Sequence, residues 1–186
     1  IRQAREIKIP AFIPTNYFWA NNAYNGQRII PVKVIDKDTG RSLEIPTANF
    51  MKDLVIKRSE PTPRAYLISG DAVASFQSLL ERHAIPYSIL QEPKRFWVEG
   101  CQLLRVEDYF DEVYSRYEGR QIVKRLESGE KEFPAGSILV SVEPPEGLRA
   151  LLLLEPLQMY GLYQYPDFQK LVKEDKILPV WRVLRY

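Results

Sequence analysis

The chain has 186 residues, 45% of them hydrophobic and 27% charged, a composition typical of a globular protein with one large domain or two small ones. The formal net charge is only +2, from interspersed acids and bases, which argues against a nucleic-acid binder. No apolar stretch approaches the ~20 residues that span a bilayer, so we expect no membrane span.

Residues 1–63 are predicted to form a β-rich N-terminal lobe. The apolar run 28–35 and the run 41–45 are expected to pair as a hairpin around an Asp-Lys-Asp-Thr-Gly turn. The Asp-x-Asp-x-Gly spacing is also found in calcium loops, but the further oxygen ligands and the closing glutamate of such a loop are not at the required spacing. We therefore expect Asp36 to stabilise a tight turn rather than to bind a metal.

An aromatic and asparagine-rich stretch, residues 16–26, lies before the predicted hairpin. Exposed aromatic side chains beside amides can stack on sugar rings, which makes Tyr17, Trp19 and Tyr24 the candidate ligand-binding residues of this lobe. The alternative is a loop whose aromatic rings pack back on the sheet while asparagine and glycine form turns. Both interpretations remain open at the level of sequence.

Residues 64–186 are predicted to form a C-terminal lobe of mixed α/β structure, joined to the first at the proline pair of residues 60–63. A strand, a helix with apolar residues at helical spacing and a second strand favour a β-α-β unit. These three elements are expected at residues 65–68, 71–82 and 85–90.

The remainder of the second lobe is predicted to contain strands at residues 96–106 and 109–117, a hairpin, and short helices. The hairpin is expected to pair residues 120–126 with residues 131–142, around a Ser-Gly turn. The apolar run 148–154 is expected to be a helix beneath the sheet, with Leu152 in the core. A short helix at 168–173 and a last strand at 179–184 complete an α+β fold.

Few residues of the chain suit catalysis. His83 is the sole histidine and Cys101 the sole cysteine, whereas a zinc site normally needs about three protein ligands that usually include histidine. We expect His83 to lie at a helix C-terminus and Cys101 to be a buried thiol. The acids Asp108, Asp111 and Glu112 are expected to form a solvated face. The sequence thus predicts that this chain is not an enzyme, with an unrecognised catalytic site as one alternative.

A series of short motifs resembles the region that follows the catalytic domain in bacterial zinc carboxypeptidase-like proteins of the M14 type. The likeness covers about residues 29–186 and depends on the order and spacing of the motifs. The motifs are Val32-Lys-Val-Ile-Asp36, Ala65-Tyr-Leu-Ile68, Leu80-Glu-Arg-His-Ala-Ile-Pro-Tyr87, Glu118-Gly-Arg-Gln-Ile-Val123, Pro134-Ala-Gly136 and Leu152 to Pro156.

The resemblance implies a non-catalytic C-terminal accessory domain that supports the catalytic domain or borders its substrate cleft. The His-x-x-Glu and distant His that hold zinc in that family do not occur here, so zinc is expected only in a parent catalytic domain and no cofactor is expected in this chain. The chain begins at Ile1 without a methionine, and we expect it to be a processed form or part of a longer polypeptide. The expected partner is an upstream catalytic domain of the same polypeptide. The residues do not fix the compartment, although the resemblance favours a secreted or periplasmic one.

The alternative function is a glycan- or cell-wall-binding module. Its ligand would contact Tyr17, Trp19 and Tyr24, together with Tyr163 and Tyr165 of the aromatic segment near the C-terminus. Stacking of aromatic rings on sugar faces is the physical basis of this alternative.

Overall fold

The computed structural model describes residues 9–111, 116–143, 145–158, 162, 168 and 176–185. The chain divides into two compact units. The small unit is Pro14–Ser59, and the large unit combines Ile1–Ile13 with Glu60–Tyr186. The sequence placed all of residues 1–63 in one lobe, whereas the structure groups the first thirteen residues with the large unit. Strands predominate and helices are few, so the predicted β-rich α+β fold is confirmed.

Two antiparallel ribbons build the N-terminal part of the chain. Strands β1 (Phe12–Asn21) and β4 (Met51–Pro61) pair with each other, and β2 (Ile30–Ile35) pairs with β3 (Ser42–Thr47). A short 3₁₀ helix, η2 (Asn22–Asn25), follows β1. The antiparallel β2–β3 pairing confirms the predicted hairpin.

The turn of this hairpin is held by Asp36. Its Oδ1 accepts hydrogen bonds from the Thr39 amide and hydroxyl, both at 2.7 Å, and from the Asp38 amide at 3.1 Å. Gly40 adopts φ 67°, which suits glycine in a turn. These bonds to its charged form lower the pKa of Asp36, the Thr39 hydroxyl contributing most. The carboxylate therefore stabilises the turn, as predicted.

The large unit contains two helices and most of the strands among the described residues. In chain order they are β5 (Ala65–Ile68), the 3₁₀ turn η3 (Gly70–Ala72), α1 (Val73–Arg82), β6 (Ser88–Ile89), β7 (Lys94–Glu99), β8 (Cys101–Asp111), β9 (Arg116–Arg125), β10 (Gly129–Phe133), β11 (Ile138–Ser141), α2 (Gly147–Leu154) and β12 (Val180–Arg185).

Six of these strands form one sheet in the order β10-β7-β12-β5-β11-β6, with every pairing antiparallel. Because β11 runs antiparallel to both β5 and β6, these two strands are parallel to each other and α1 connects them. By the same argument α2 connects the parallel strands β11 and β12 around β5. Two interlocked β-α-β units of this kind form the ferredoxin-like arrangement. The predicted β-α-β unit is its first half.

The sheet curls strongly. In a flat sheet β10 and β11 would lie four strand spacings apart, about 19 Å. The link between Phe133 and Ile138 reaches at most about 17 Å when fully extended, and it is turned, because the Ser137 amide bonds the Pro134 carbonyl at 3.3 Å. Curling lets the sheet bury a second core without helices, which contains Ala65, Leu67, Phe96, Val98, Phe133 and Val183.

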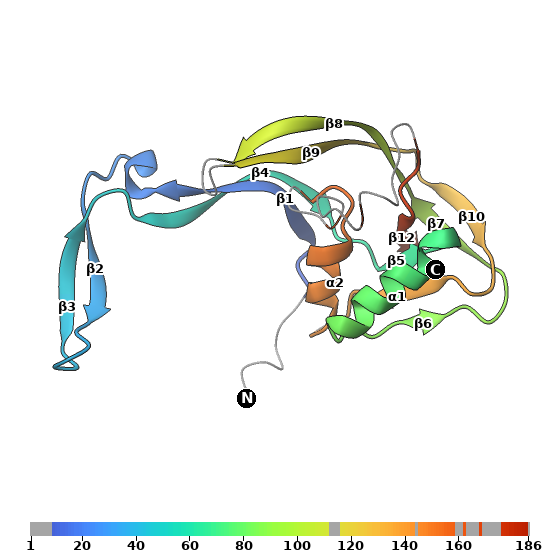
Figure 1. Ribbon diagram of the computed structural model, residues 1–186, viewed down its shortest axis with the longest axis horizontal. Helices are drawn as coiled ribbons and strands as arrows, with labels where there is room; N and C mark the ends of the chain where they lie inside the picture. The colour runs from blue at the N-terminus through green and yellow to red at the C-terminus, as the bar shows by residue number, and fades with distance from the viewer. Residues whose placement is uncertain are drawn as a thin grey trace. The chain divides into compact units, whose positions relative to one another are not determined.

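The main core lies between the sheet and the two helices. Alternate residues of β5, Tyr66 and Ile68, face α1 and α2, which lie side by side (Figure 1). From α1 the buried residues are Phe76, Leu79 and Leu80, and from α2 they are Gly147, Ala150, Leu151 and Leu154. The predicted place of Leu152 in the core is wrong: its side chain is 61% exposed, because it points away from the face that carries Leu151 and Leu154.

The predicted hairpin of residues 120–126 with residues 131–142 is also wrong. Strand β9 pairs with β8, and β10 pairs with β7. The predicted strand 109–117 instead contains the end of β8 and the start of β9, with residues 112–115 outside the described part. The predicted strand 96–106 is two strands divided at Gly100, where an added Cβ would lie 2.6 Å from the Trp181 ring.

Candidate functional site

The large unit buries a charged side chain at its centre. Arg182 of β12 is fully buried, and its Nε donates to Glu155 Oε2 at 3.1 Å. Its Nη1 bonds Glu99 and its Nη2 bonds the Pro61 carbonyl. Glu155, which follows α2, also accepts a hydrogen bond from the Tyr66 hydroxyl at 2.8 Å. The guanidinium therefore ties three segments of the chain to β12.

A second arginine extends this network toward the surface. Arg125 at the end of β9 donates to Glu99 Oε1 and to Glu60 Oε2, both at 2.5 Å. Glu60 and Glu99 are buried, and the Arg125 side chain is about a third exposed. Three carboxylates thus share two guanidinium groups. Each carboxylate has a cationic partner, which is what makes their burial tolerable.

Burial sets the protonation of the groups in this network. It raises the pKa of Glu155, although Arg182 and the Tyr66 hydroxyl oppose the shift by favouring the carboxylate. The pKa of Tyr66 also rises well above its usual value, chiefly through burial. Arg182 remains cationic, because the charges of Glu155 and Glu99 raise its pKa despite burial.

The thiol of Cys101 lies near the same charges. It is buried, as predicted, and burial raises its pKa to about 12, with a further contribution from the negative charge of Glu155. A thiol with that pKa stays protonated at neutral pH, and the thiol form is a poor nucleophile. The chemistry open to this network is therefore the stabilisation of buried charge and the anchoring of Glu60 and Pro61 to the sheet.

His83 is exposed and ends α1, in the predicted place. Its backbone carbonyl accepts a hydrogen bond from Arg149 Nη1 at 2.8 Å, which connects the C-terminus of α1 to α2. Among the residues that the structure describes, no group of three or more histidine, cysteine or acidic side chains is arranged to hold a metal ion.

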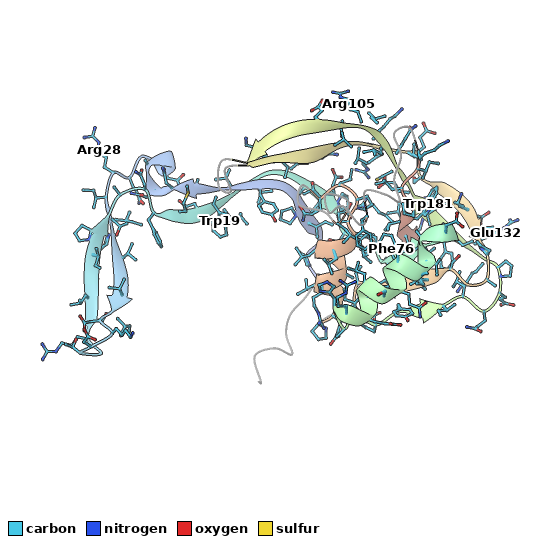
Figure 2. All side chains as sticks on the ribbon, viewed as in Figure 1. Trp19, Arg28, Phe76, Arg105, Glu132 and Trp181 are labelled. Atoms are coloured by element: carbon cyan, nitrogen blue, oxygen red, sulfur yellow. The ribbon has the colours of Figure 1, made fainter. Side chains whose placement is uncertain are left out.

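Of the predicted aromatic candidates, the structure describes the side chains of Tyr17 and Trp19, whose i, i+2 spacing on β1 places them on one face of that strand. Trp19 on β1 is 57% exposed and projects from its ribbon (Figure 2), whereas Tyr17 is half-buried. Tyr24 belongs to η2, and its side chain lies outside the described part. Tyr163 and Tyr165 lie outside the described residues altogether.

The asparagines of this stretch stabilise loops. Asn22 is buried, its amide nitrogen donates to the Gln27 carbonyl at 3.0 Å, and its amide oxygen accepts from the Phe50 amide at 2.9 Å. Asn25 donates to Asp53 at 2.6 Å. These asparagine side chains therefore hold loop backbone in place, which is the role that the second interpretation of the sequence expected for them.

The small unit exposes most of its large apolar side chains. Only Thr15, Ala20 and Asn22 are buried among its described side chains. Nine of the fifteen exposed large hydrophobic side chains among the described residues belong to this unit: Trp19, Ile29, Ile35, Leu43, Ile45, Phe50, Met51, Leu54 and Ile56. Only Trp19 among the nine is a tryptophan or tyrosine, and the other eight are aliphatic, methionine or phenylalanine side chains.

The pairing register of the β2–β3 hairpin determines which side chains share a face. Residues that pair across an antiparallel ladder lie on the same face, so one face carries only uncharged residues. This hairpin face consists of the pairs Ile30–Thr47, Val32–Ile45 and Val34–Leu43, and the opposite face consists of Pro31–Pro46, Lys33–Glu44 and Ile35–Ser42.

Sequence reasoning missed both the network and the hairpin face. Glu155 directly follows an apolar helix, and Arg182 lies within the apolar run of the last strand, so each is a charged residue where the pattern predicts burial. A charged residue at a position where the pattern predicts burial was therefore the sequence feature that could have revealed the network. For the hairpin face the signal was the alternation of Val32 and Val34 with Lys33, which defines an apolar face without saying what covers it.

No family model matches this chain, and neither a curated protein nor a solved structure matches it. The resemblance to the accessory region of zinc carboxypeptidase-like proteins therefore stays a prediction. Among the described residues no helix is long and apolar enough to cross a membrane.

Proposed function

We propose that this chain is a non-catalytic accessory domain that packs on the catalytic domain of a zinc carboxypeptidase-like protein. The observation that carries this proposal is the exposed aliphatic surface of the small unit. A stable domain rarely leaves so many large apolar side chains in water unless another protein covers them.

The ribbon of β1 and β4 supplies the docking surface. Leu54 and Ile56 of β4 are 44% and 50% exposed, and their i, i+2 spacing places them on one face of the strand. Met51 on the same strand and Trp19 on β1 are also exposed. Methionine and aromatic residues are enriched in protein interfaces, and aliphatic side chains form their dry centre.

The interior of the large unit supports a structural role for this domain. The buried carboxylates of Glu99 and Glu155 are engaged by Arg182, and the thiol of Cys101 is held in its protonated form. In the proposed protein the zinc and its ligands belong to the catalytic domain, and this chain supplies a folded platform beside it.

The test begins with the residues that the gene encodes before Ile1. We expect them to form a domain with a His-x-x-Glu motif and a distant histidine. Hydroxyl-radical footprinting then compares the long polypeptide with this chain, and we expect oxidation of Leu54 and Ile56 to fall several-fold in the long polypeptide. A gene without such a domain overturns the proposal, as does equal oxidation in the two proteins.

A matched pair of variants sharpens the same test. Ile56→Lys should lower the melting temperature of the long polypeptide while leaving that of this chain unchanged, because the charge would be buried only in the interface. Ile35→Lys makes the same chemical change on β2, outside the β1–β4 ribbon, where the side chain is 72% exposed; it is the control and should change neither melting temperature.

The exposure of Trp19 favours glycan binding as a second candidate function. A pull-down with purified bacterial cell wall tests it: retention of the wild-type chain that is lost in Trp19→Ala supports this function. Absence of retention, or equal retention of the two proteins, counts against it.

A further inference from the structure

The short helix η2 ends in an asparagine that is followed by a glycine, Asn25-Gly26. The chain contains five asparagines, and Asn25 is the only one of them that precedes a glycine. Both residues of the pair are exposed, and no atom lies within 4 Å of the place that a Cβ on Gly26 would take. Gly26 adopts φ 78°, a conformation that suits glycine in a turn.

An Asn-Gly pair carries both groups of an intramolecular reaction. The Gly26 backbone nitrogen can attack Cγ of Asn25 and close a cyclic imide, and glycine has no side chain that obstructs this approach. The bond from Gly26 N to Asn25 Cγ forms, the bond from Cγ to Nδ2 breaks, and Nδ2 leaves as ammonia with the proton of the Gly26 amide. Water then opens the imide at either carbonyl. The product is an aspartate at position 25, linked to Gly26 through its α- or its β-carboxyl group.

Two hydrogen bonds restrain the reacting groups in the folded chain. The Gly26 amide donates to the Ala23 carbonyl at 2.9 Å, and Asn25 Nδ2 donates to Asp53 Oδ2 at 2.6 Å. The reaction therefore requires this turn to open locally. Because η2 has only four residues and its end is exposed, opening it costs much less free energy than opening the buried core. The fold thus slows the reaction without preventing it.

We propose that Asn25 is a site of spontaneous modification, and that its conversion to aspartate releases the end of η2 from β4. The new carboxylate takes the place of the amide that donated to Asp53, so repulsion between two carboxylates replaces the hydrogen bond. The reaction is irreversible once ammonia has left. The modified turn therefore does not close again in its original form.

A second contact limits how far this release extends. The Asn22 amide donates to the Phe50 carbonyl at 3.0 Å, and the Phe50 amide donates to Asn22 Oδ1 at 2.9 Å. Neither of these bonds involves Asn25, so the start of η2 stays attached next to β4. The amides of Gly26 and Gln27, which bond to carbonyls within η2, should lose their protection.

Peptide mapping by mass spectrometry tests the modification. The whole chain is incubated at mildly alkaline pH in ¹⁸O-labelled water, beside a synthetic peptide of residues 20–30. We expect Asn25 to convert at least about tenfold faster than Asn21 or Asn49, because Asn22 and Phe50 follow those two residues and obstruct imide formation. Both linkages should appear at position 25, each with ¹⁸O incorporated. Equal rates at the three asparagines overturn the proposal, as does a chain in which Asn25 stays intact after the peptide has converted.

Hydrogen exchange followed by NMR tests the structural consequence. In Asn25→Asp the amides of Gly26 and Gln27 should exchange at least about tenfold faster than in the wild type, whereas the Phe50 amide should be unaffected. Asp53→Asn is the matched background, because an amide at position 53 can donate to the carboxylate at position 25. There, Asn25→Asp should accelerate exchange less than about threefold. Equal acceleration in the two backgrounds overturns the proposed release.

This inference goes beyond the proposed accessory role and can fail independently of it. Both measurements use this chain alone, and the groups that they follow all belong to the small unit. Neither result depends on whether a catalytic domain precedes Ile1.

Discussion

The two units of this chain differ in how far they bury their side chains. The large unit buries apolar residues on both sides of a curled sheet and also encloses charged groups, of which Arg182 and Glu155 are the deepest. The small unit buries few of its described side chains, and nine large hydrophobic side chains among them are exposed. Both units have similar strand-forming sequences, so composition alone does not produce the difference. The difference lies in whether a second layer is present.

A sheet becomes a stable core only when its apolar face is covered. In the large unit, α1 and α2 cover one face and the curl of the sheet covers the other. In the small unit, the alternation of apolar and polar residues along β2 is as clear, but no other described element of that unit covers its apolar face. The large unit therefore covers its own apolar faces, whereas the small unit leaves most of its large apolar side chains exposed.

Removing one ion pair from each unit should give the largest difference in stability between the two units. Arg182→Met leaves the buried Glu155 without its cation and should cost about 3–5 kcal/mol of unfolding free energy. Lys33→Met removes an exposed partner of Glu44 in the small unit and should cost less than about 1 kcal/mol. Urea unfolding followed by tryptophan fluorescence measures both values. Similar costs for the two variants would show that the Arg182 network is not buried as described.

A leucine deletion in each unit gives the next largest effect. Leu151→Ala in α2 removes a buried side chain and should lower the unfolding free energy by about 2–5 kcal/mol. Leu43→Ala on the hairpin face, and Leu152→Ala on the exposed side of α2, should each cost within about 0.5 kcal/mol for the monomer. Urea unfolding at low protein concentration measures the three values. A large cost for Leu43→Ala would mean that the hairpin face is already covered within the chain.

The contrast between Leu151 and Leu152 also shows what a sequence can predict. The strand 65–68 is a short apolar run, and the helix over Phe76, Leu79 and Leu80 has apolar residues at helical spacing; the structure confirms both elements. Helix α2 is apolar at nearly every position, so helical periodicity does not define its buried face. The existence of that helix was predictable, and the orientation of Leu152 was not.

Strand pairing was not predictable for a similar reason. Strands β9 and β10 are separated by a three-residue link, which suggested a hairpin, but each pairs with an earlier strand. Strand β9 pairs with the strand that directly precedes it, whereas β10 pairs with β7 across the intervening β8 and β9, a pairing that the local sequence does not encode. The network was missed because its members, Glu60, Glu99, Arg125, Glu155 and Arg182, come from distant parts of the chain.

The smallest expected effect concerns how stability depends on pH. Glu155 of the large unit and Asp36 of the small unit should contribute to stability with opposite pH dependence. Burial raises the pKa of Glu155 above its ordinary value of 4.5, whereas hydrogen bonds from Thr39 lower the pKa of Asp36 below its ordinary value of 3.8. A raised pKa in the folded state means that folding favours the protonated acid. The contribution of Glu155 to stability is therefore fully present below pH 4.5 and is lost as the pH rises through its folded pKa.

Asp36 has the opposite sign, because folding favours its charged form. Its contribution is present above pH 3.8 and is lost as the pH falls through its folded pKa. Carboxyl ¹³C NMR measures both titrations directly, and the midpoint should lie above 4.5 for Glu155 and below 3.8 for Asp36. Glu155→Gln should also remove part of the decline in stability between pH 4.5 and neutrality, whereas Asp36→Asn should not. A Glu155 midpoint below 4.5 would mean that its bonds to Arg182 and Tyr66 outweigh burial, and the interior of the large unit would then be better solvated than its packing indicates.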